Sequence, residues 1–191
     1  MLYYYPDFPI PTQSVIDAVA NMQSQIDRLL AVKRKVEPTS VSAHWLVLKA
    51  PKTVVDWASQ EFSNQYHVAV QVFAGDSYFL PHIDRGRSKV FNFLVDTGGD
   101  NVKTCFWKLK PEFSSHLVDN SRKGFEYNTI DLVESVVFKP GQWWNIDVSQ
   151  IHSVEGLDPS RKRISLTLHP QTDGVSIADQ FVSRLSKPKV T

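Results

Sequence analysis

Apolar residues in the first part of the chain recur with the period of a helix. Between Ser14 and Val32 they are spaced by three or four residues, which places them on one face of an amphipathic helix. Ser14, with Asp17 three residues later, is the expected N-cap. The apolar face consists of Val15, Val19, Met22, Ile26, Leu29 and Val32.

The same face contains a seven-residue spacing, from Val15 through Met22 to Leu29, which is typical of a coiled-coil seam. Lys33 falls where the next apolar seam position would be. We therefore favour packing of this helix on the domain's own core, with a helical dimer as the alternative.

A second helix and then a run of short strands follow. The helix is predicted from Thr53 to Ser63, with Asp56 in its first turn and Phe62 among its apolar residues. From Tyr66 onward, segments rich in Val, Phe, Ile, Thr and Trp are separated by turn signals. The predicted strands are Tyr66–Ala74, Lys89–Asp96, Val102–Lys108, Ser135–Phe138, Gln142–Ile146 and Arg163–His169. Helices followed by several short strands favour an antiparallel sandwich or barrel with helices against one side.

Composition limits the class of protein. With 191 residues, 42% of them apolar, the chain fits one domain. Lys and Arg (21) nearly balance Asp and Glu (20), which disfavours nucleic acid or an anionic membrane as a partner. Cys105 is the single cysteine, so an internal disulfide and a multi-thiolate zinc site are excluded. Neither a signal peptide nor an apolar membrane span is apparent, and we expect a cytoplasmic protein.

A possible metal-binding pattern lies in the strand-rich part. His82 and Asp84 are two residues apart, so at a strand end their side chains point to the same side. His152 lies in a later segment of similar character. Two imidazoles and one carboxylate on one face of a metal are typical of non-haem Fe(II) oxygenases, because three positions remain for a chelating 2-oxo acid and O2. A surface histidine beside a solvated aspartate is the alternative.

Arg163 and Ser165 would share a face of the last predicted strand. A guanidinium binds a carboxylate through two hydrogen bonds, and a nearby hydroxyl adds a third, which suits the distal carboxylate of 2-oxoglutarate. The alternative is a solvated basic run, residues 161–163, with Ser165 incidental.

The order of these residues resembles a known superfamily. Gly75, Tyr78 and Pro81-His82-Ile83-Asp84 are similar to the first metal-ligand segment of prolyl-hydroxylase-type Fe(II)/2-oxoglutarate oxygenases. Asn145, Ile151-His152-Ser153-Val154, Arg163-Ile164-Ser165-Leu166 and Leu168-His169-Pro170 are similar to the distal half of aspartyl/asparaginyl hydroxylase-like members, including bacterial and phage versions. The similarity covers about residues 66–170.

The resemblance implies a double-stranded β-helix, the jelly-roll or cupin-like core, buttressed by N-terminal helices. It divides one oxygenase domain, 1–191, into a helical part of about 1–65, a core of about 66–170 and a tail of about 171–191. His82, Asp84 and His152 would hold Fe(II), with 2-oxoglutarate and O2 as co-substrates. The expected products are succinate, CO2 and a hydroxylated peptidyl or amino-acid side chain.

Asp84 refines this expectation. Bifunctional animal aspartyl/asparaginyl hydroxylases lack the carboxylate ligand, so this chain departs from that subgroup. Halogenating relatives replace the carboxylate with a small residue, so the presence of Asp84 favours hydroxylation.

Further residues are candidates for the two substrates. Asn92 and Gln71 lie within predicted strands and would contact 2-oxoglutarate if they face inward, whereas outward positions would make them incidental. Tyr78, Arg87 and Trp107 are candidates to face the primary substrate. Trp143 and Trp144 are adjacent on a strand, so at most one of them lines the interior.

Two other classes of protein remain as alternatives. A metal-binding cupin that acts as an isomerase or a sugar-binding module would need a similar barrel, but no buried carboxylate clamp. A non-enzymatic interaction protein would carry a vestigial triad.

Overall fold

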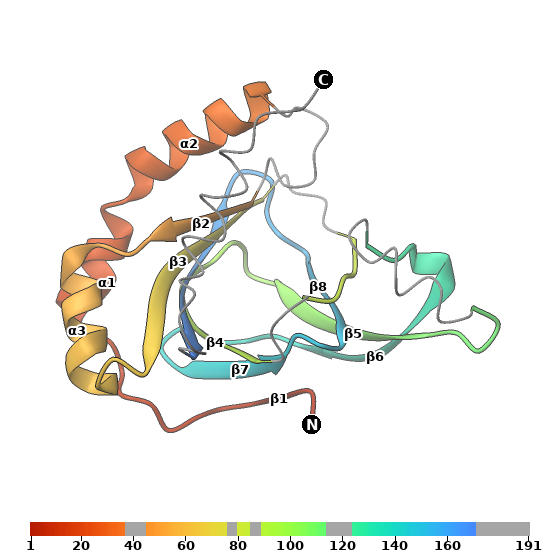
Figure 1. Cartoon of the computed structure of the whole chain (residues 1–191). Coiled ribbons are helices and arrows are strands. Elements are labelled where there is room, and N and C mark those ends of the chain that lie inside the picture. Colours follow the sequence, from red (N-terminus) through yellow and green to blue (C-terminus); the bar gives the residue numbers. More distant parts are fainter. Residues whose placement is uncertain (37–44, 76–79, 85–88, 114–123, 171–191) are drawn as a thin grey trace, which may run out of the picture.

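The computed structural model describes residues 1–36, 45–75, 80–84, 89–113 and 124–170. Its strands form two antiparallel sheets (Figure 1). The larger sheet has the order β1 (Tyr3–Tyr4), β7 (Trp143–Asp147), β4 (Lys89–Thr97), β9 (Lys162–Pro170), β3 (Tyr66–Ala74) and β2 (Trp45–Lys49). The smaller sheet has the order β6 (Ile130–Val136), β5 (Lys103–Leu109) and β8 (Ile151–Glu155). The helices are α1 (Gln13–Ala20), α2 (Gln23–Val36), α3 (Lys52–Phe62) and the 3-10 turn η3 (Tyr127–Thr129).

The strand pairing defines a double-stranded β-helix. β3 pairs with β9, β4 with β7, and β5 with β6. An isolated bridge between His82 and His152 adds residues 80–84 to β8. The first half of the core thus pairs with the second half in reverse order, as in a long hairpin wound into a jelly roll. β2 and β1 extend the two edges of the larger sheet.

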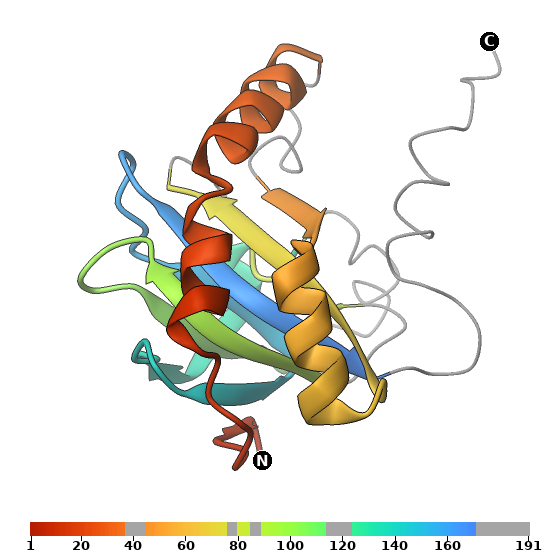
Figure 2. The same cartoon turned by 90° about the vertical axis from the view of Figure 1, so that its left-hand side faces the viewer.

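The three helices cover the outer face of the larger sheet, as Figures 1 and 2 show. Apolar residues of α1, α2 and α3 pack there against Phe93, Trp143 and Leu166, among others, in the largest buried cluster. A second apolar cluster, which includes Phe106 and Phe138, lies on the strands that face the barrel interior. No helix among the described residues is long and apolar enough to cross a membrane.

The predicted first helix is in fact two helices. The chain turns at Asn21 and Met22, where the Met22 amide bonds to the Val19 carbonyl (3.0 Å) before α2 begins. Both helices contribute apolar residues to the cluster on the outer face of the larger sheet. The expected capping by Ser14 is also wrong, since Thr12 is the N-cap and makes no side-chain cap bond. Packing on the domain's own core is confirmed for the face from Val15 to Ile26, whereas Val32 is exposed.

Most predicted strands match the structure to within about two residues, and the second helix does as well. The strand predicted at Ser135–Phe138 is wrong, because β6 ends at Val136 and begins at Ile130. β6 is an edge strand with mostly exposed side chains, and the register shifts opposite Phe106 and Trp107, so its sequence lacks a regular alternation. β1, β2 and β8 were not predicted as strands. The predicted tail, 171–191, lies outside the described residues.

Candidate metal centre

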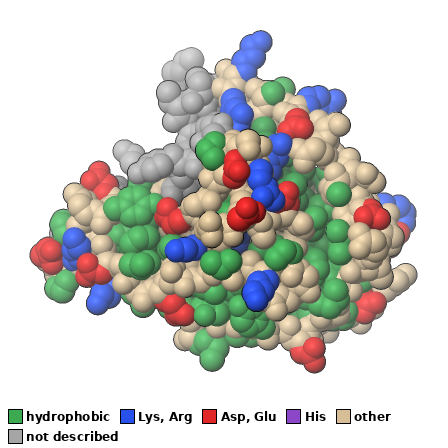
Figure 3. All heavy atoms as spheres, turned by 180° about the vertical axis from the view of Figure 1, so that it is seen from behind, with side chains coloured by type: hydrophobic (Ala, Val, Ile, Leu, Met, Phe, Trp, Pro, Cys, Tyr) green, Lys and Arg blue, Asp and Glu red, His purple; other side chains and the backbone are tan. Residues whose placement is uncertain are grey.

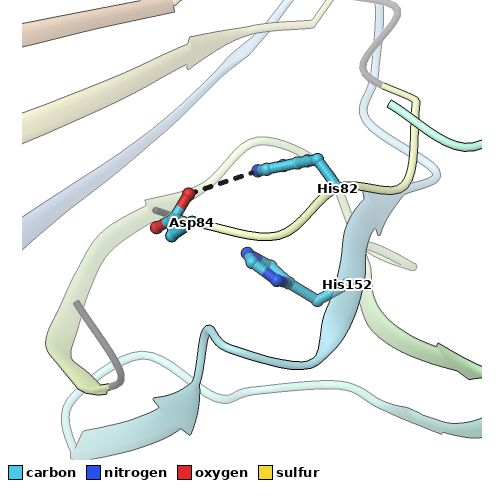
Figure 4. A group of neighbouring side chains, drawn as sticks. All are labelled: His82, Asp84 and His152. Carbon is cyan, nitrogen blue, oxygen red and sulfur yellow. Dashed lines mark ion pairs between the residues drawn. The ribbon is translucent and has the colours of Figure 1, made fainter. Parts of the chain in front are cut away.

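Three potential metal ligands meet at the edge of the smaller sheet. One ligand atom from each of His82, Asp84 and His152 lies within 4.8 Å of the other two. The three side chains point toward one another from two segments of the chain (Figure 4). His82 Nε2 lies 3.7 Å from Asp84 Oδ1, and the two imidazole rings are 4.6 Å apart between centroids. These dimensions suit a single metal ion between the three side chains.

Backbone hydrogen bonds fix the two segments that carry these side chains. The His82 amide donates to the His152 carbonyl and the His152 amide donates to the His82 carbonyl, each at 2.9 Å. The Asp84 amide donates to the Val148 carbonyl at 2.9 Å. The ligand positions are therefore set by the sheet itself, and the two-residue spacing places His82 and Asp84 on the same side.

Each imidazole is oriented by a backbone carbonyl two residues before it in the sequence. His82 Nδ1 lies 3.1 Å from the Leu80 carbonyl oxygen, and His152 Nδ1 lies 2.9 Å from the Gln150 carbonyl oxygen. A carbonyl only accepts hydrogen bonds, so each Nδ1 carries the proton and each Nε2 becomes the ligating atom. Such backbone contacts commonly fix the tautomer and orientation of metal-binding histidines.

The donor set is that of a facial triad. Two neutral imidazoles and one carboxylate suit iron and related divalent metals, and they occupy only half of an octahedral coordination sphere. A structural zinc site would instead be closed by four protein ligands. The three residues predicted from the sequence thus fit a metal with positions left for exogenous ligands.

The same three side chains line a cavity between the two sheets, with a volume of about 160 Å³. Its other polar lining residues come from both sheets. They are Gln71 on β3, Asn92 on β4, Thr104 on β5, and Arg163 and Ser165 on β9. Trp144 on β7 also lines the cavity, with its indole N–H as a polar atom. The cavity therefore joins the candidate metal centre to a set of hydrogen-bond donors.

Arg163 is the most unusual of these donors. It is only 3% exposed, and its Nη2 has no hydrogen-bond partner among the described residues. Burial lowers the pKa of its guanidinium to about 10. The guanidinium lies over the ring of Trp144, 5.6 Å from its centroid. A buried cation without an anionic partner is costly, and a carboxylate in the cavity would supply that partner.

The alternative to a carboxylate clamp was that residues 161–163 form a solvated basic run. The structure fits that description for Arg161 but not for Arg163. Arg161 is partly exposed and pairs with Asp96 at 3.0 Å and with Asp100 at 3.2 Å. Lys162 pairs with Asp27 of α2 at 2.8 Å. Of these three consecutive basic residues, only Arg163 lines the cavity. Lys162 points to the other side of β9, and Arg161 precedes the strand.

The inward positions of Asn92 and Gln71 are organised by a residue that the sequence analysis missed. The Thr167 hydroxyl donates to Asn92 Oδ1 at 3.0 Å and lies 3.5 Å from Gln71 Oε1. Both carbonyl oxygens thus point to Thr167, and the amide nitrogens remain as donors. The alternation of polar and apolar residues in β9 was the available signal for Thr167.

The residues predicted to face the primary substrate are placed differently. Tyr78 and Arg87 lie outside the described residues. Trp107 does not line the cavity; its Nε1 donates to Ser153 Oγ at 2.9 Å, and it packs beside the cluster that contains Ile151. The expectation for the tryptophan pair is confirmed, since Trp144 lines the cavity and Trp143 packs against the helices.

The fold and the three ligands define a double-stranded β-helix protein with a candidate metal centre. No protein-family model matches the chain, and no curated protein matches it in sequence. A solved structure of a non-haem monooxygenase, the ThoJ–nickel complex, is 14% identical, covers 89% of this chain and 76% of that chain, and has a TM-score of 0.43. A Pseudomonas putida prolyl-4-hydroxylase is 13% identical, with 91% and 99% covered and a TM-score of 0.33.

Proposed function

We propose that this protein is an Fe(II)- and 2-oxoglutarate-dependent oxygenase that hydroxylates its substrate. The observation that carries the proposal is the buried Nη2 of Arg163, which has no partner in the described part of the chain and lies in the same cavity as His82, Asp84 and His152. A metal triad and a cationic clamp in one small cavity suit a ligand with a chelating end and a carboxylate end. 2-Oxoglutarate has both.

The reaction is balanced by the co-substrates. With iron bound, substrate C–H, O2 and 2-oxoglutarate are converted to substrate C–OH, succinate and CO2. O2 is the oxidant and accepts four electrons, two from the substrate C–H bond and two from the 2-oxo acid. The 2-oxo acid is oxidised to succinate and loses its C1 carboxylate as CO2.

The protein's own residues bind, orient and shield the reactants. His82, Asp84 and His152 hold the metal on one face, while Arg163 and Ser165 hold the far end of the 2-oxo acid. Asn92 and Gln71 offer amide donors to its polar atoms. The apolar walls, which include Val90 and Ile146, keep bulk water from the reacting end.

For the primary substrate we favour a peptidyl or amino-acid side chain, on the basis of the motif resemblance. The chain's formal net charge is +1, and the face in Figure 3 intersperses acidic and basic side chains. A large basic surface, as nucleic-acid binders use, is not seen on that face. A cytoplasmic location is part of the proposal, since the lone Cys105 suits a reducing compartment.

The test is production of succinate from 2-oxoglutarate by purified protein with Fe(II), O2 and ascorbate, the last as reductant for turnover without substrate. We expect slow succinate formation that Asp84→Ala and His152→Ala abolish. His67→Ala is the matched control, because His67 lies on β3 away from the cavity lining. Metal bound by the wild-type protein with no succinate formed would reject the oxygenase and favour a non-oxidative cupin.

A further inference from the structure

Three hydrogen-bond donors on buried side chains line the cavity without a partner among the described residues. They are Thr104 Oγ1, Trp144 Nε1 and Arg163 Nη2. The three side chains are 1%, 4% and 3% exposed. Buried polar groups in folded proteins nearly always have a partner, so three unpartnered donors in one cavity require an explanation.

Two other indole N–H groups in the described residues have a hydrogen-bond acceptor. Trp143 Nε1 donates to the Pro9 carbonyl at 2.8 Å. Trp107 Nε1 donates to Ser153 Oγ at 2.9 Å. Trp144 is adjacent to Trp143 in sequence, yet its N–H meets no acceptor in the described part of the chain. The difference coincides with its position on the cavity side of the sheet.

The ring of Trp144 is held firmly although its N–H is not satisfied. It stacks on Phe138 with the centroids 4.0 Å apart and the planes inclined by 6°. Arg163 lies over the ring, 5.6 Å from its centroid. The ring thereby serves as a rigid support for the guanidinium, with an attraction between cation and ring that is stronger when both are buried.

The donors come from both walls of the barrel. Trp144 and Arg163 lie on β7 and β9 of the larger sheet, whereas Thr104 lies on β5 of the smaller sheet. Ser165, two residues after Arg163, adds a fourth donor from the larger sheet. An ionised carboxylate accepts at about four lone-pair positions, so it matches such a set, whereas a neutral apolar group does not.

We propose that Thr104 and Trp144 are specificity residues that complete, with Arg163, the pocket for the far carboxylate, and so select dicarboxylic over monocarboxylic 2-oxo acids. This inference rests on the proposed function. A 2-oxo acid that ends in a methyl group would leave these donors buried and unpaired, and it would bind poorly for that reason.

The test compares two ligands of equal chain length. 2-Oxoglutarate and 2-oxopentanoate differ only in the terminal carboxylate or methyl group. Their binding to Mn(II)-loaded protein is measured by calorimetry without O2, for the wild-type protein and for Trp144→Phe and Thr104→Val. Thr104→Val keeps the size of the side chain and removes the hydroxyl donor, whereas Trp144→Phe removes the indole N–H together with part of the ring. Thermal unfolding of the unliganded proteins is measured in parallel.

We expect each variant to bind 2-oxoglutarate about 10-fold or more weakly, as is typical of a lost hydrogen bond to a charged group. Binding of 2-oxopentanoate should be unchanged or tighter. The unliganded Thr104→Val variant should unfold at the same or a higher temperature, because an unsatisfied buried donor has been removed and the side-chain size is kept. If the two side chains had only a structural role, the substitutions would lower the unfolding temperature and weaken the binding of both ligands equally. Thr104→Ser should restore 2-oxoglutarate binding, and Trp143→Phe should leave both affinities unchanged.

The outcomes separate this inference from the proposed function. If wild-type protein does not prefer 2-oxoglutarate to 2-oxopentanoate, both proposals fail. If Arg163→Gln removes the preference while Trp144→Phe and Thr104→Val retain it, the proposed function stands and this inference is wrong.

Discussion

The two faces of the larger sheet differ in the side chains that the same strand contributes to them. On β9 the outward residues are Ile164, Leu166 and Leu168, which pack under the helices. The inward residues are polar, namely Arg163, Ser165, Thr167 and His169. The outer face gains stability from apolar burial, whereas the inner face buries polar groups, among them Arg163, whose Nη2 has no partner among the described residues. Substitutions on the two faces should therefore affect different properties.

The largest effect is expected at the candidate metal centre. Asp84→Ala removes the carboxylate ligand and should weaken metal binding by more than about 100-fold, since even residues behind the ligands cost 10- to 100-fold. Metal content after dialysis and titration with Mn(II) measure the change. If the variant bound the metal with wild-type affinity, Asp84 would not be a metal ligand. His67→Ala controls for the loss of a histidine that does not line the cavity.

Substitutions on the outer face should change the stability of the protein and not its affinity for 2-oxoglutarate. Leu166 is fully buried under the helices, so Leu166→Ala should lower the free energy of unfolding by about 2 to 5 kcal/mol. The affinity of the folded protein for 2-oxoglutarate should stay within about twofold of wild type, because the side chain points away from the cavity. Denaturant unfolding and calorimetry measure the two quantities. A variant of normal stability would contradict the assignment of this face to the core.

The inner face should show the reverse pattern at Arg163, three residues before Leu166. Arg163→Met removes a buried charge, and the variant should be as stable as wild type or more stable. Its affinity for 2-oxoglutarate should fall by about 1.5 to 3 kcal/mol, the contribution of hydrogen bonds to a charged group. The same two measurements apply. Lower stability with unchanged affinity would mean that Arg163 has only a structural role.

The smallest effect concerns pH. Burial lowers the pKa of the Arg163 guanidinium from its ordinary value to about 10 in the folded protein. Below about pH 10 both folded and unfolded chains hold the proton, and the folded state bears the full desolvation cost. As pH rises above about 10, the folded state loses the proton first and this cost declines.

The stability difference between Arg163→Met and wild type should therefore be constant from about pH 7 to about pH 9 and shrink above about pH 10. Denaturant unfolding of both proteins over this range measures the difference. A difference that already changes between about pH 7 and about pH 9 would point to another titrating group.

Local patterns in the sequence predicted much of the fold and part of the candidate site. The span of β3 follows from its run of β-formers, and the His82–Asp84 spacing already implies a shared side of the chain. The helix break at Asn21 was not predicted, because the apolar spacing continues across it from Val19 to Met22 and Ile26. Thr104 and Trp144 were not predicted as ligand donors, because their significance arises only when β5 and β7 face each other across the cavity.

The central claim is that the metal triad and the Arg163 clamp form one site bridged by one ligand. It is tested most directly by the affinity for Mn(II) with and without saturating 2-oxoglutarate, in the absence of O2. Thermodynamic linkage requires the metal to tighten 2-oxoglutarate by the same factor as 2-oxoglutarate tightens the metal. We predict tightening of about 10-fold or more in the wild-type protein, in the range typical of coupled sites, and much less in Arg163→Gln. Equal Mn(II) affinity with and without 2-oxoglutarate would contradict the account.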